Sequence, residues 1–244
     1  MRIDILTLFP EMVQAVLGES ITGRALKNNL YELNTVNIRD FTEDKHRRVD
    51  DSPYGGGSGM VMEAQPIYDA FLSVRSPNAK VIYLSPQGQP FCQQKARILS
   101  EEQHLIFLCG HYEGVDERVL EEIVDEEISL GDFVLTGGEI AACAICDAVL
   151  RLIPGVLGND ASSCEESFEN SLLEYPQYTR PEEVLGRRVP EVLLSGHHKN
   201  IASFRREKSL ERTFYKRPDL LEKAVLSKED AAFLEILKKR FIVK

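Results

Sequence analysis

Three glycine-containing loops follow predicted strands, and their residues are the ones best suited to hold a small ligand. They are residues 85–88 (SPQG), 110–114 (GHYEG) and 130–138 (LGDFVLTGG). Ligands of parallel sheets bind at the carboxyl ends of the strands, where glycines let backbone amides approach closely. One such loop is weak support, because glycine turns occur in every strand-to-helix connection. Three of them together predict a small-molecule site.

Two other glycine-containing segments are only loosely similar to nucleotide-binding motifs. Segment 18–25 (GESITGRA) carries Arg24 where a phosphate-binding loop has lysine, and it lies between two short helical segments instead of after a strand. Segment 54–60 (YGGGSGM) begins a dinucleotide pattern, but Met62 occupies the third glycine position. We reject both as nucleotide sites.

The cysteines predict buried thiols and no metal site. The chain has five cysteines without a repeated spacing. Cys143 and Cys146 lie in an apolar stretch, three residues apart, and so share one face of a predicted helix. No second Cys/His pair stands at zinc spacing.

The elements that must position these loops alternate between strand and helix. Short apolar runs predict strands, and segments with helical spacing separate them. Such alternation is typical of βαβ units, so we expect an α/β fold with a mainly parallel sheet and helices on both faces. The expected strands are 3–9, 33–38, 80–84 and 104–109, and the expected helices are 65–74, 93–100, 117–124 and 139–152.

The last third of the chain has a different character. Residues 158–178 are polar and weakly periodic, and helices are expected at 200–214, 218–226 and 227–241. The N-terminus is a short apolar run that stops at Pro10, unlike a signal peptide. Apolar runs stay well below the ~18 residues that a membrane span needs. We therefore expect a cytoplasmic protein with no membrane contact.

Charge is distributed unevenly along the 244 residues. The net charge of −10 argues at first sight against a nucleic-acid partner. Residues 1–160 carry a balance of −12, however, whereas residues 161–244 carry +2. The segment from Lys199 to Arg217 holds seven basic and two acidic side chains. An acidic body thus carries a locally basic region.

Eight segments, in order and spread over nearly the whole length, resemble the bacterial tRNA (guanine-N1)-methyltransferase family of the SPOUT superfamily. They are 5–12 (ILTLFPEM), 46–60 (HRRVDDSPYGGGSGM), 81–88 (VIYLSPQG), 109–118 (CGHYEGVDER), 129–139 (SLGDFVLTGGE), 153–158 (IPGVLG), 178–182 (YTRPE) and 192–197 (VLLSGH). So many segments in the right order are far more specific than a lone glycine motif.

The resemblance implies a deep trefoil knot in the α/β domain, which general folding rules disfavour. It also implies a small, mostly α-helical C-terminal domain. The expected division is a knotted S-adenosylmethionine-binding domain at 1–159, a flexible interdomain linker with the catalytic acid at 160–177, and a helical tRNA-binding domain at 178–244. The family forms homodimers whose active sites are shared between subunits.

The cofactor implied by the resemblance is S-adenosylmethionine, bound by the three glycine loops. A requirement for Mg²⁺ is also compatible with the family, although the sequence displays no set of metal ligands. The implied cofactor-binding residues are Tyr83, Leu84, Ser85, Gly110, Tyr112, Glu113, Leu130, Gly131, Asp132, Phe133, Val134, Leu135, Gly137 and Gly138.

The implied substrate is the guanosine just 3′ of the anticodon, methylated at N1. Neutral guanine carries a proton on N1, so the transfer needs a base. The family uses the Asp of an Asp-Ser-Phe motif, and this chain has Glu166 there, with Asp160 and Glu165 as competing acids. Arg151 matches an arginine that stabilises charge on the guanine. The structural alternatives are a solvated linker glutamate and an arginine at a helix end.

Basic residues in two regions are implied tRNA contacts. A helical segment around 199–217 alternates basic and aromatic residues, which fits either a phosphate-binding surface or an ordinary amphipathic helix. The glycine loop near residue 50 is either a further tRNA contact or a structural turn. The candidates are Arg47, Arg48, Lys199, Arg205, Arg206, Lys208 and Arg212.

Two other functions remain open from the sequence. One is another SPOUT RNA methyltransferase, acting on a ribose 2′-hydroxyl or on another base. The other is a non-catalytic tRNA-binding protein, which the change from Asp to Glu at position 166 favours and the intact cofactor loops oppose.

Overall fold

The computed structural model describes residues 1–158 and 166–242. Within it the chain divides into two compact units, an N-terminal unit, Met1–Asp160, and a C-terminal unit, Ala161–Lys244. Each unit is described separately below. In the described residues, no helix combines the length and the apolar character needed to cross a membrane.

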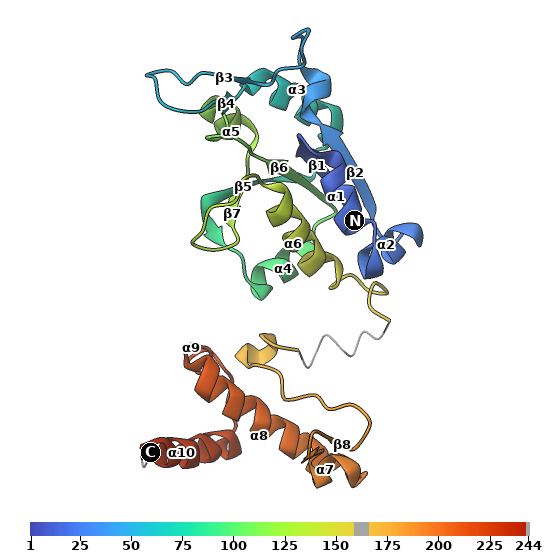
Figure 1. Ribbon diagram of the computed structural model, residues 1–244, viewed down its shortest axis with the longest axis vertical. Helices are drawn as coiled ribbons and strands as arrows, with labels where there is room; N and C mark the ends of the chain where they lie inside the picture. Colours follow the sequence, from blue (N-terminus) through green and yellow to red (C-terminus); the bar gives the residue numbers. More distant parts are fainter. Residues whose placement is uncertain (159–165, 243–244) are drawn as a thin grey trace. The chain divides into compact units, whose positions relative to one another are not determined.

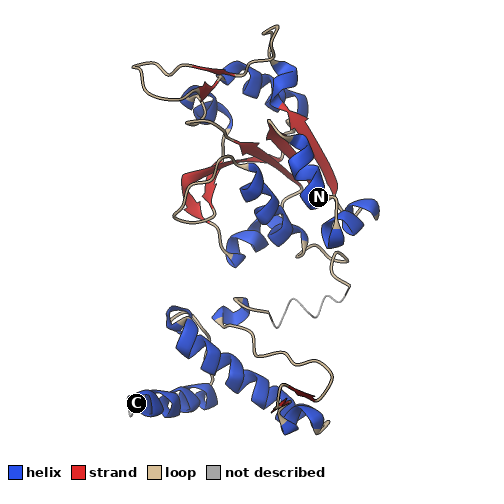
Figure 2. Ribbon diagram, viewed as in Figure 1, coloured by secondary structure: helices blue, strands red, loops and turns tan. Residues whose placement is uncertain are grey.

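A parallel sheet of five strands forms the centre of the N-terminal unit (Figures 1 and 2). Its order is β2-β1-β6-β5-β7, and every neighbouring pair is parallel. The strands are β1 (Arg2–Thr7), β2 (Glu32–Asn37), β5 (Ala79–Pro90), β6 (His104–Cys109) and β7 (Glu126–Ser129). The predicted mainly parallel α/β sheet is confirmed, and β7 is a strand that the sequence reading did not name.

The sheet buries both faces, as its apolar runs require. Alternate residues of β6 enter two different cores: Leu105 and Phe107 pack on one side, Ile106 and Leu108 on the other. The first core contains α1 (Pro10–Leu17), α2 (Ser20–Lys27), α4 (Gln93–Ser100) and α6 (Glu139–Leu150). The second contains the 3-10 helix η1 (Ile38–Phe41), α3 (Ala64–Val74) and α5 (Glu117–Ile123). Helices thus cover both faces.

Segment 18–25, rejected as a phosphate loop, contains the turn after α1 and most of α2. Gly18 ends α1, and its amide donates to the Gln14 carbonyl at 2.9 Å. A Cβ at Gly23 would overlap the Gly18 carbonyl, so these glycines serve close helix packing. Two further short strands, β3 (Asp50–Asp51) and β4 (Val61–Met62), form an antiparallel pair beside the sheet.

The described part of the C-terminal unit is mostly helical. It contains η3 (Glu169–Ser171), the two-residue strands β8 (Glu183–Val184) and β9 (Arg187–Arg188), and the helices α7 (Glu191–Leu194), α8 (His198–Lys216), α9 (Pro218–Leu221) and α10 (Lys228–Ile242). Its core includes Leu172, Leu210, Leu234 and Leu237. The helix predicted over 218–226 was too long, because the α9 helix ends at Leu221.

Ser227 caps the start of α10. The Ser227 hydroxyl accepts a hydrogen bond from the Asp230 amide at 3.1 Å, and the Asp230 carboxylate accepts one from the Ser227 amide at 2.9 Å. This reciprocal arrangement satisfies two backbone donors at the helix start. Because Asp230 also pairs with Arg206 of α8 at 2.8 Å, it fixes the two helices to each other.

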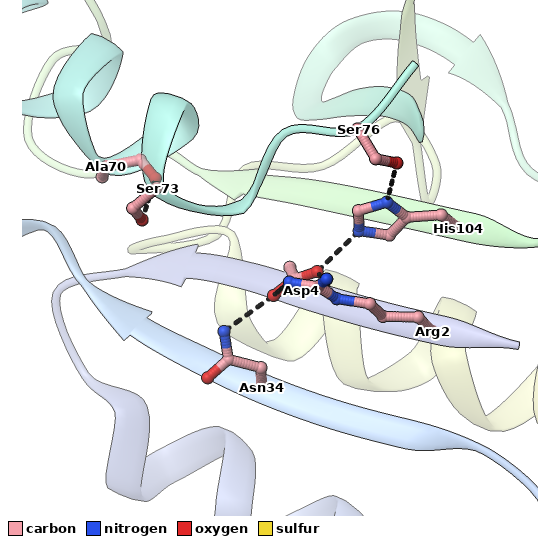
Figure 3. Close-up of polar contacts among 7 residues, drawn as sticks. All are labelled: Arg2, Asp4, Asn34, Ala70, Ser73, Ser76 and His104. Carbon is pink, nitrogen blue, oxygen red and sulfur yellow. Dashed lines mark hydrogen bonds and ion pairs between the residues drawn. The ribbon is translucent and has the colours of Figure 1, made fainter. Parts of the chain in front are cut away.

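A buried carboxylate joins three strands at the amino end of the sheet (Figure 3). Asp4 of β1 is fully buried. Its carboxylate lies 2.6 Å from Nε2 of His104 in β6 and accepts a hydrogen bond of 2.7 Å from the Asn34 side chain in β2. It also forms an ion pair with Arg2 at 2.8 Å. His104 Nδ1 in turn lies 2.7 Å from the Ser76 hydroxyl, beyond the end of α3. The charge is buried but fully partnered, as such groups must be.

Removing this carboxylate should destabilise the N-terminal unit. We expect Asp4→Ala to lower the free energy of unfolding by about 3 kcal/mol, because His104, Asn34 and Arg2 all lose their acceptor. Ser76→Ala, which removes an exposed hydroxyl at the edge of the network, should cost under about 1 kcal/mol. Urea denaturation of both variants checks this, and equal losses would contradict the central place of Asp4.

Candidate functional site

A cavity of about 370 Å³ lies at the carboxyl ends of β5, β6 and β7. Its walls come from the segments that follow these strands, residues 83–87, 110–115 and 128–138. The first residues of α5 and α6 complete it. The three glycine loops singled out in the sequence therefore meet around one space, where a parallel sheet is expected to bind its ligand.

The loops approach each other so closely that some positions admit only glycine. A Cβ on Gly138 would lie 2.7 Å from the Cys109 Cα, and the Gly138 amide donates to the Gly110 carbonyl at 3.0 Å. A Cβ on Gly88 would likewise meet the backbone of Glu127 and Ile128 in β7. Backbone atoms cannot move aside as a side chain would, so these glycines set the shape of the cavity.

The cavity is acidic. Glu113, Glu117 and Glu127 line it, and no lysine or arginine of the described residues does so. Such a lining repels phosphate groups and attracts a cation. A nucleotide with its phosphates is therefore a poor ligand for this space, whereas a positively charged ligand is favoured. Among residues 1–158 and 166–242, no group of three acidic, histidine or cysteine side chains is placed to hold a metal ion.

Tyr83 is a buried tyrosine in the cavity wall, and its pKa reflects that burial. Burial raises the pKa of its phenol to about 12, and the negative charges of Glu127 and Glu117 add to that effect. The phenol packs against Gly110, where a Cβ would lie 2.9 Å from the hydroxyl oxygen. Tyr83 therefore remains a neutral side chain at physiological pH.

Thirteen of the fourteen residues predicted for the cofactor line this cavity. The exception is Asp132, whose side chain is exposed. The list of implied cofactor-binding residues omitted His111, Glu117 and Glu127, which also line the cavity. His111 and Glu117 lie inside or just after a glycine loop, a signal that could have found them. Glu127 was missed because its strand was not named.

The glycine loop near residue 50 is attached to the cavity. The Glu113 amide donates to the Met60 carbonyl at 3.0 Å, and a Cβ at Gly59 would overlap the Glu113 side chain. Arg39 of η1 donates to the Tyr112 hydroxyl at 3.2 Å and to the Arg47 carbonyl at 3.3 Å. This loop therefore depends on the same residues that form the cavity wall.

The basic residues predicted in this loop are exposed and ion-paired. Arg47 pairs with Asp40. Arg48 pairs with Asp44 at 3.1 Å, and this hydrogen bond lowers the pKa of the Asp44 carboxyl to about 2. An incoming anion would compete with these carboxylates for the two arginines, and such surface pairs contribute little stability.

The two predicted catalytic residues do not line this cavity. Arg151 lies at the C-terminal end of α6, whereas the cavity includes Gly138 before its first residue. The twelve-residue helix between them is about 18 Å long. Glu166 lines a different cavity, of about 400 Å³ in the C-terminal unit, with Tyr175, Arg205 and Arg206. Asp160 and Glu165, the competing acids, lie outside the described residues.

Most of the predicted basic residues of α8 are engaged within their own unit. Arg205 stacks on Tyr175 at 4.7 Å from the ring centroid, and Arg206 pairs with Asp230. Lys208 pairs with Glu211 at 2.6 Å, and Arg212 donates to the Glu174 carbonyl at 3.3 Å. Lys199 is exposed near the start of α8 and forms no ion pair with any described residue.

The two cysteines of α6 match the prediction from the sequence. Cys143 and Cys146 are buried free thiols on α6, as predicted. Burial raises the pKa of Cys143 to about 11 and that of Cys146 as well, so neither is a reactive thiolate.

Comparison with known proteins places nearly the whole chain in one group. Residues 1–223 match the family profile described as tRNA (Guanine-1)-methyltransferase TrmD. A protein of Ruminiclostridium cellulolyticum named tRNA (guanine-N(1)-)-methyltransferase is 59% identical over 226 residues, covering 91% of this chain and 97% of the relative. A protein with the same name from Clostridium beijerinckii is 60% identical to this chain over 236 residues, covering 96% of this chain and 98% of the relative. Another, from Bacillus cereus, is 54% identical over 241 residues, covering 98% of this chain and 99% of the relative.

Tyr83 gives a test of the cavity by pH titration. Burial raises the pKa of both Tyr83 and Tyr31 to about 12, so we expect two tyrosines of the folded chain to ionise there in an ultraviolet titration. In Tyr83→Phe one of the two should disappear, and Tyr31 remains as the internal reference. Because the unfolded phenol ionises near pH 10, its contribution to stability is complete below pH 10 and is lost as the pH rises towards 12. A Tyr83→Phe titration that matched the wild type would contradict this burial.

Proposed function

The chain belongs to the tRNA (guanine-1)-methyltransferase family, and we propose that it transfers a methyl group from S-adenosylmethionine to N1 of guanosine 37 in tRNA. The match over residues 1–223, which spans both units, carries this proposal. The acidic cavity at the strand ends supports it independently, because it favours a positively charged ligand. The enzyme would act in the cytoplasm, where tRNA is modified.

The residues present fit S-adenosylmethionine. Its sulfonium and ammonium groups are cationic and would be favoured beside Glu113, Glu117 and Glu127. The backbone of the glycine loops would approach the nucleoside, and the predicted positions from Tyr83 to Gly138 would enclose it. When bound, the cofactor supplies a methyl group on an electron-poor sulfur. Mg²⁺ is retained only as the family resemblance implies it, because among the described residues no group of acidic, histidine or cysteine side chains is placed to hold a metal ion.

Glu166 is proposed as the base that removes the N1 proton. As that proton leaves, negative charge develops towards the guanine ring oxygen, and the Arg151 guanidinium would stabilise it. Glutamate keeps the carboxylate of the family's aspartate and adds one methylene. The backbone at residue 166 must therefore lie slightly further from the guanine ring than it would with an aspartate. Arg205 and Arg206, which line the same cavity as Glu166, add positive charge around it.

A homodimer is proposed to complete the site. Arg151 is a helix length away from the cavity of its own unit, so a second subunit is a natural source of the arginine that reaches each substrate. An exposed apolar face supports this. Phe9, Met12 and Val16 lie on one side of α1, and Ile140 of the neighbouring α6 is also half exposed. Exposed apolar faces of this kind mark association surfaces.

The knot and the three-part domain division are retained as proposals. Loop 130–138 runs back against the end of β6, where His111 and Gly137 form an antiparallel bridge, and this close approach supports a threaded chain. Residues 172–174, within the proposed linker 160–177, are bonded to α8: the Leu173 amide donates to Thr213 at 2.9 Å. The proposed tRNA-binding domain, 178–244, carries that helix.

Methyl transfer to tRNA transcripts tests the function. With labelled S-adenosylmethionine, a transcript carrying guanosine at position 37 should be methylated, and the same transcript with adenosine there should not. Mapping of the product should place the methyl group on N1. A methyl group on a ribose or on another base would favour a different SPOUT methyltransferase, and tRNA binding without transfer would favour a non-catalytic protein.

Glu166→Gln should abolish most turnover in that assay. We expect kcat to fall by about 10²- to 10⁴-fold, because the amide cannot accept the N1 proton. The affinity for S-adenosylmethionine, measured by calorimetry, should be unchanged. Glu166→Asp, which restores the family's residue, should remain active. Wild-type turnover in Glu166→Gln would assign the base to another group.

Lys199→Glu should weaken tRNA binding without disturbing the fold. Among the described residues Lys199 has no ion-pair partner, so its substitution breaks no internal contact, whereas Arg206→Glu would also break the pair with Asp230. We expect a several-fold loss of tRNA affinity and a salt dependence reduced by about one phosphate contact. Filter binding at several salt concentrations checks both. An unchanged salt dependence would remove Lys199 from the interface.

A further inference from the structure

A buried carboxylate, Glu139, lies beside the cavity without lining it. It is 2% exposed and is the first residue of α6. Its Oε1 accepts a hydrogen bond from the Thr7 hydroxyl at 2.6 Å, and its Oε2 lies 2.7 Å from His111 Nε2. Thr7 ends β1, and His111 follows β6. One carboxylate therefore joins three elements where they meet at the cavity.

The surroundings suit an ionised carboxylate. The first turn of a helix favours negative charge, and both oxygens have a hydrogen-bond partner. An ionised carboxylate can only accept, so the His111 imidazole must donate from Nε2. The His111 ring also packs against Phe9, with 4.9 Å between the ring centroids. The Phe9 amide donates to the Thr7 hydroxyl at 2.9 Å, which leaves that hydroxyl pointing its hydrogen at Glu139.

The imidazole in turn sets the cavity wall. A Cβ at Gly137 would overlap the His111 ring, and it would lie 2.7 Å from Glu139 Oε2. His111 and Gly137 both line the cavity, and they form the bridge between loops 110–114 and 130–138. The position of the imidazole therefore sets the distance between these two loops, and the hydrogen bond to Glu139 fixes that position.

We propose that Glu139 is a positioning residue for the methyl donor: through His111 it fixes the distance between the two loops that enclose the ligand. The identity of the ligand rests on the proposed function. The role itself rests on the Thr7–Glu139–His111 contacts, and the expected effect is on donor binding, with no effect on tRNA binding.

Calorimetry on the full-length chain tests this with S-adenosylmethionine and S-adenosylhomocysteine as probes. Glu139→Ala should raise the Kd of both by about tenfold or more, because the imidazole loses its anchor. Glu139→Gln should restore most of the affinity, since an amide can bond both neighbours. Thr7→Val should weaken binding and Thr7→Ser should not. Glu122→Ala, an exposed glutamate on α5, is the matched control.

Kinetics separate positioning from mere stability. In Glu139→Ala the KM for the donor should rise while the KM for tRNA stays at its wild-type value. If Glu139→Ala and Thr7→Val lower the Tm but bind both probes with wild-type Kd, the role is structural and the inference is overturned. Should Glu139→Ala fail to fold, Thr7→Val against Thr7→Ser decides. A wild-type chain that bound neither probe would instead contradict the proposed function.

Discussion

Close contact between backbones at the carboxyl ends of β5, β6 and β7 is the constraint on which the cavity depends. Gly138 contacts the backbone of Cys109, and Gly88 contacts the backbone of β7, and in both places the distance is too short for a Cβ atom. Because backbone atoms are fixed by the parallel ladder behind them, the loops inherit the rigidity of the sheet. The buried carboxylates at the two ends of the sheet, Asp4 and Glu139, then tie neighbouring elements together around this frame.

The strands with continuous apolar runs could be given bounds from the sequence, whereas the strand expected before loop 130–138, which is β7, could not. Residues 104–109 are buried on both faces, so the pattern is unmistakable. In β7 two of four residues are glutamates: Glu126 is satisfied by Lys80 and Lys95, and Glu127 faces the cavity. Because Lys80 and Lys95 are both distant from Glu126 in the sequence, the sequence does not indicate that this glutamate is paired within a strand. The α9 helix was overestimated because helical spacing continues past Leu221 although the helix does not.

The site was predictable to the extent that it lies in loops after strands. Glycine spacing and the family resemblance together named the residues that meet at the cavity. Arg39 and Glu139 were not identified because their partners lie far along the chain. Arg39 is bonded to Tyr112, and Glu139 is bonded to Thr7 and His111. A sequence shows residue types but not such pairs. The acidic character of the N-terminal unit was visible as a charge sum, but only the structure shows that Glu113, Glu117 and Glu127 line one cavity.

Charge also explains why the proposed reaction needs two units. An acidic cavity suits a cationic methyl donor, and for the same reason it repels the phosphates of tRNA. In the proposed reaction the substrate would therefore be held by cations elsewhere, and α8 of the C-terminal unit carries basic residues that could do so. Several of these cations already neutralise carboxylates of their own unit, as Arg206 does with Asp230. Under the proposed function, the surface that α8 would offer to tRNA is consequently smaller than the basic composition of the segment suggests, and Lys199 is the residue we propose for it first.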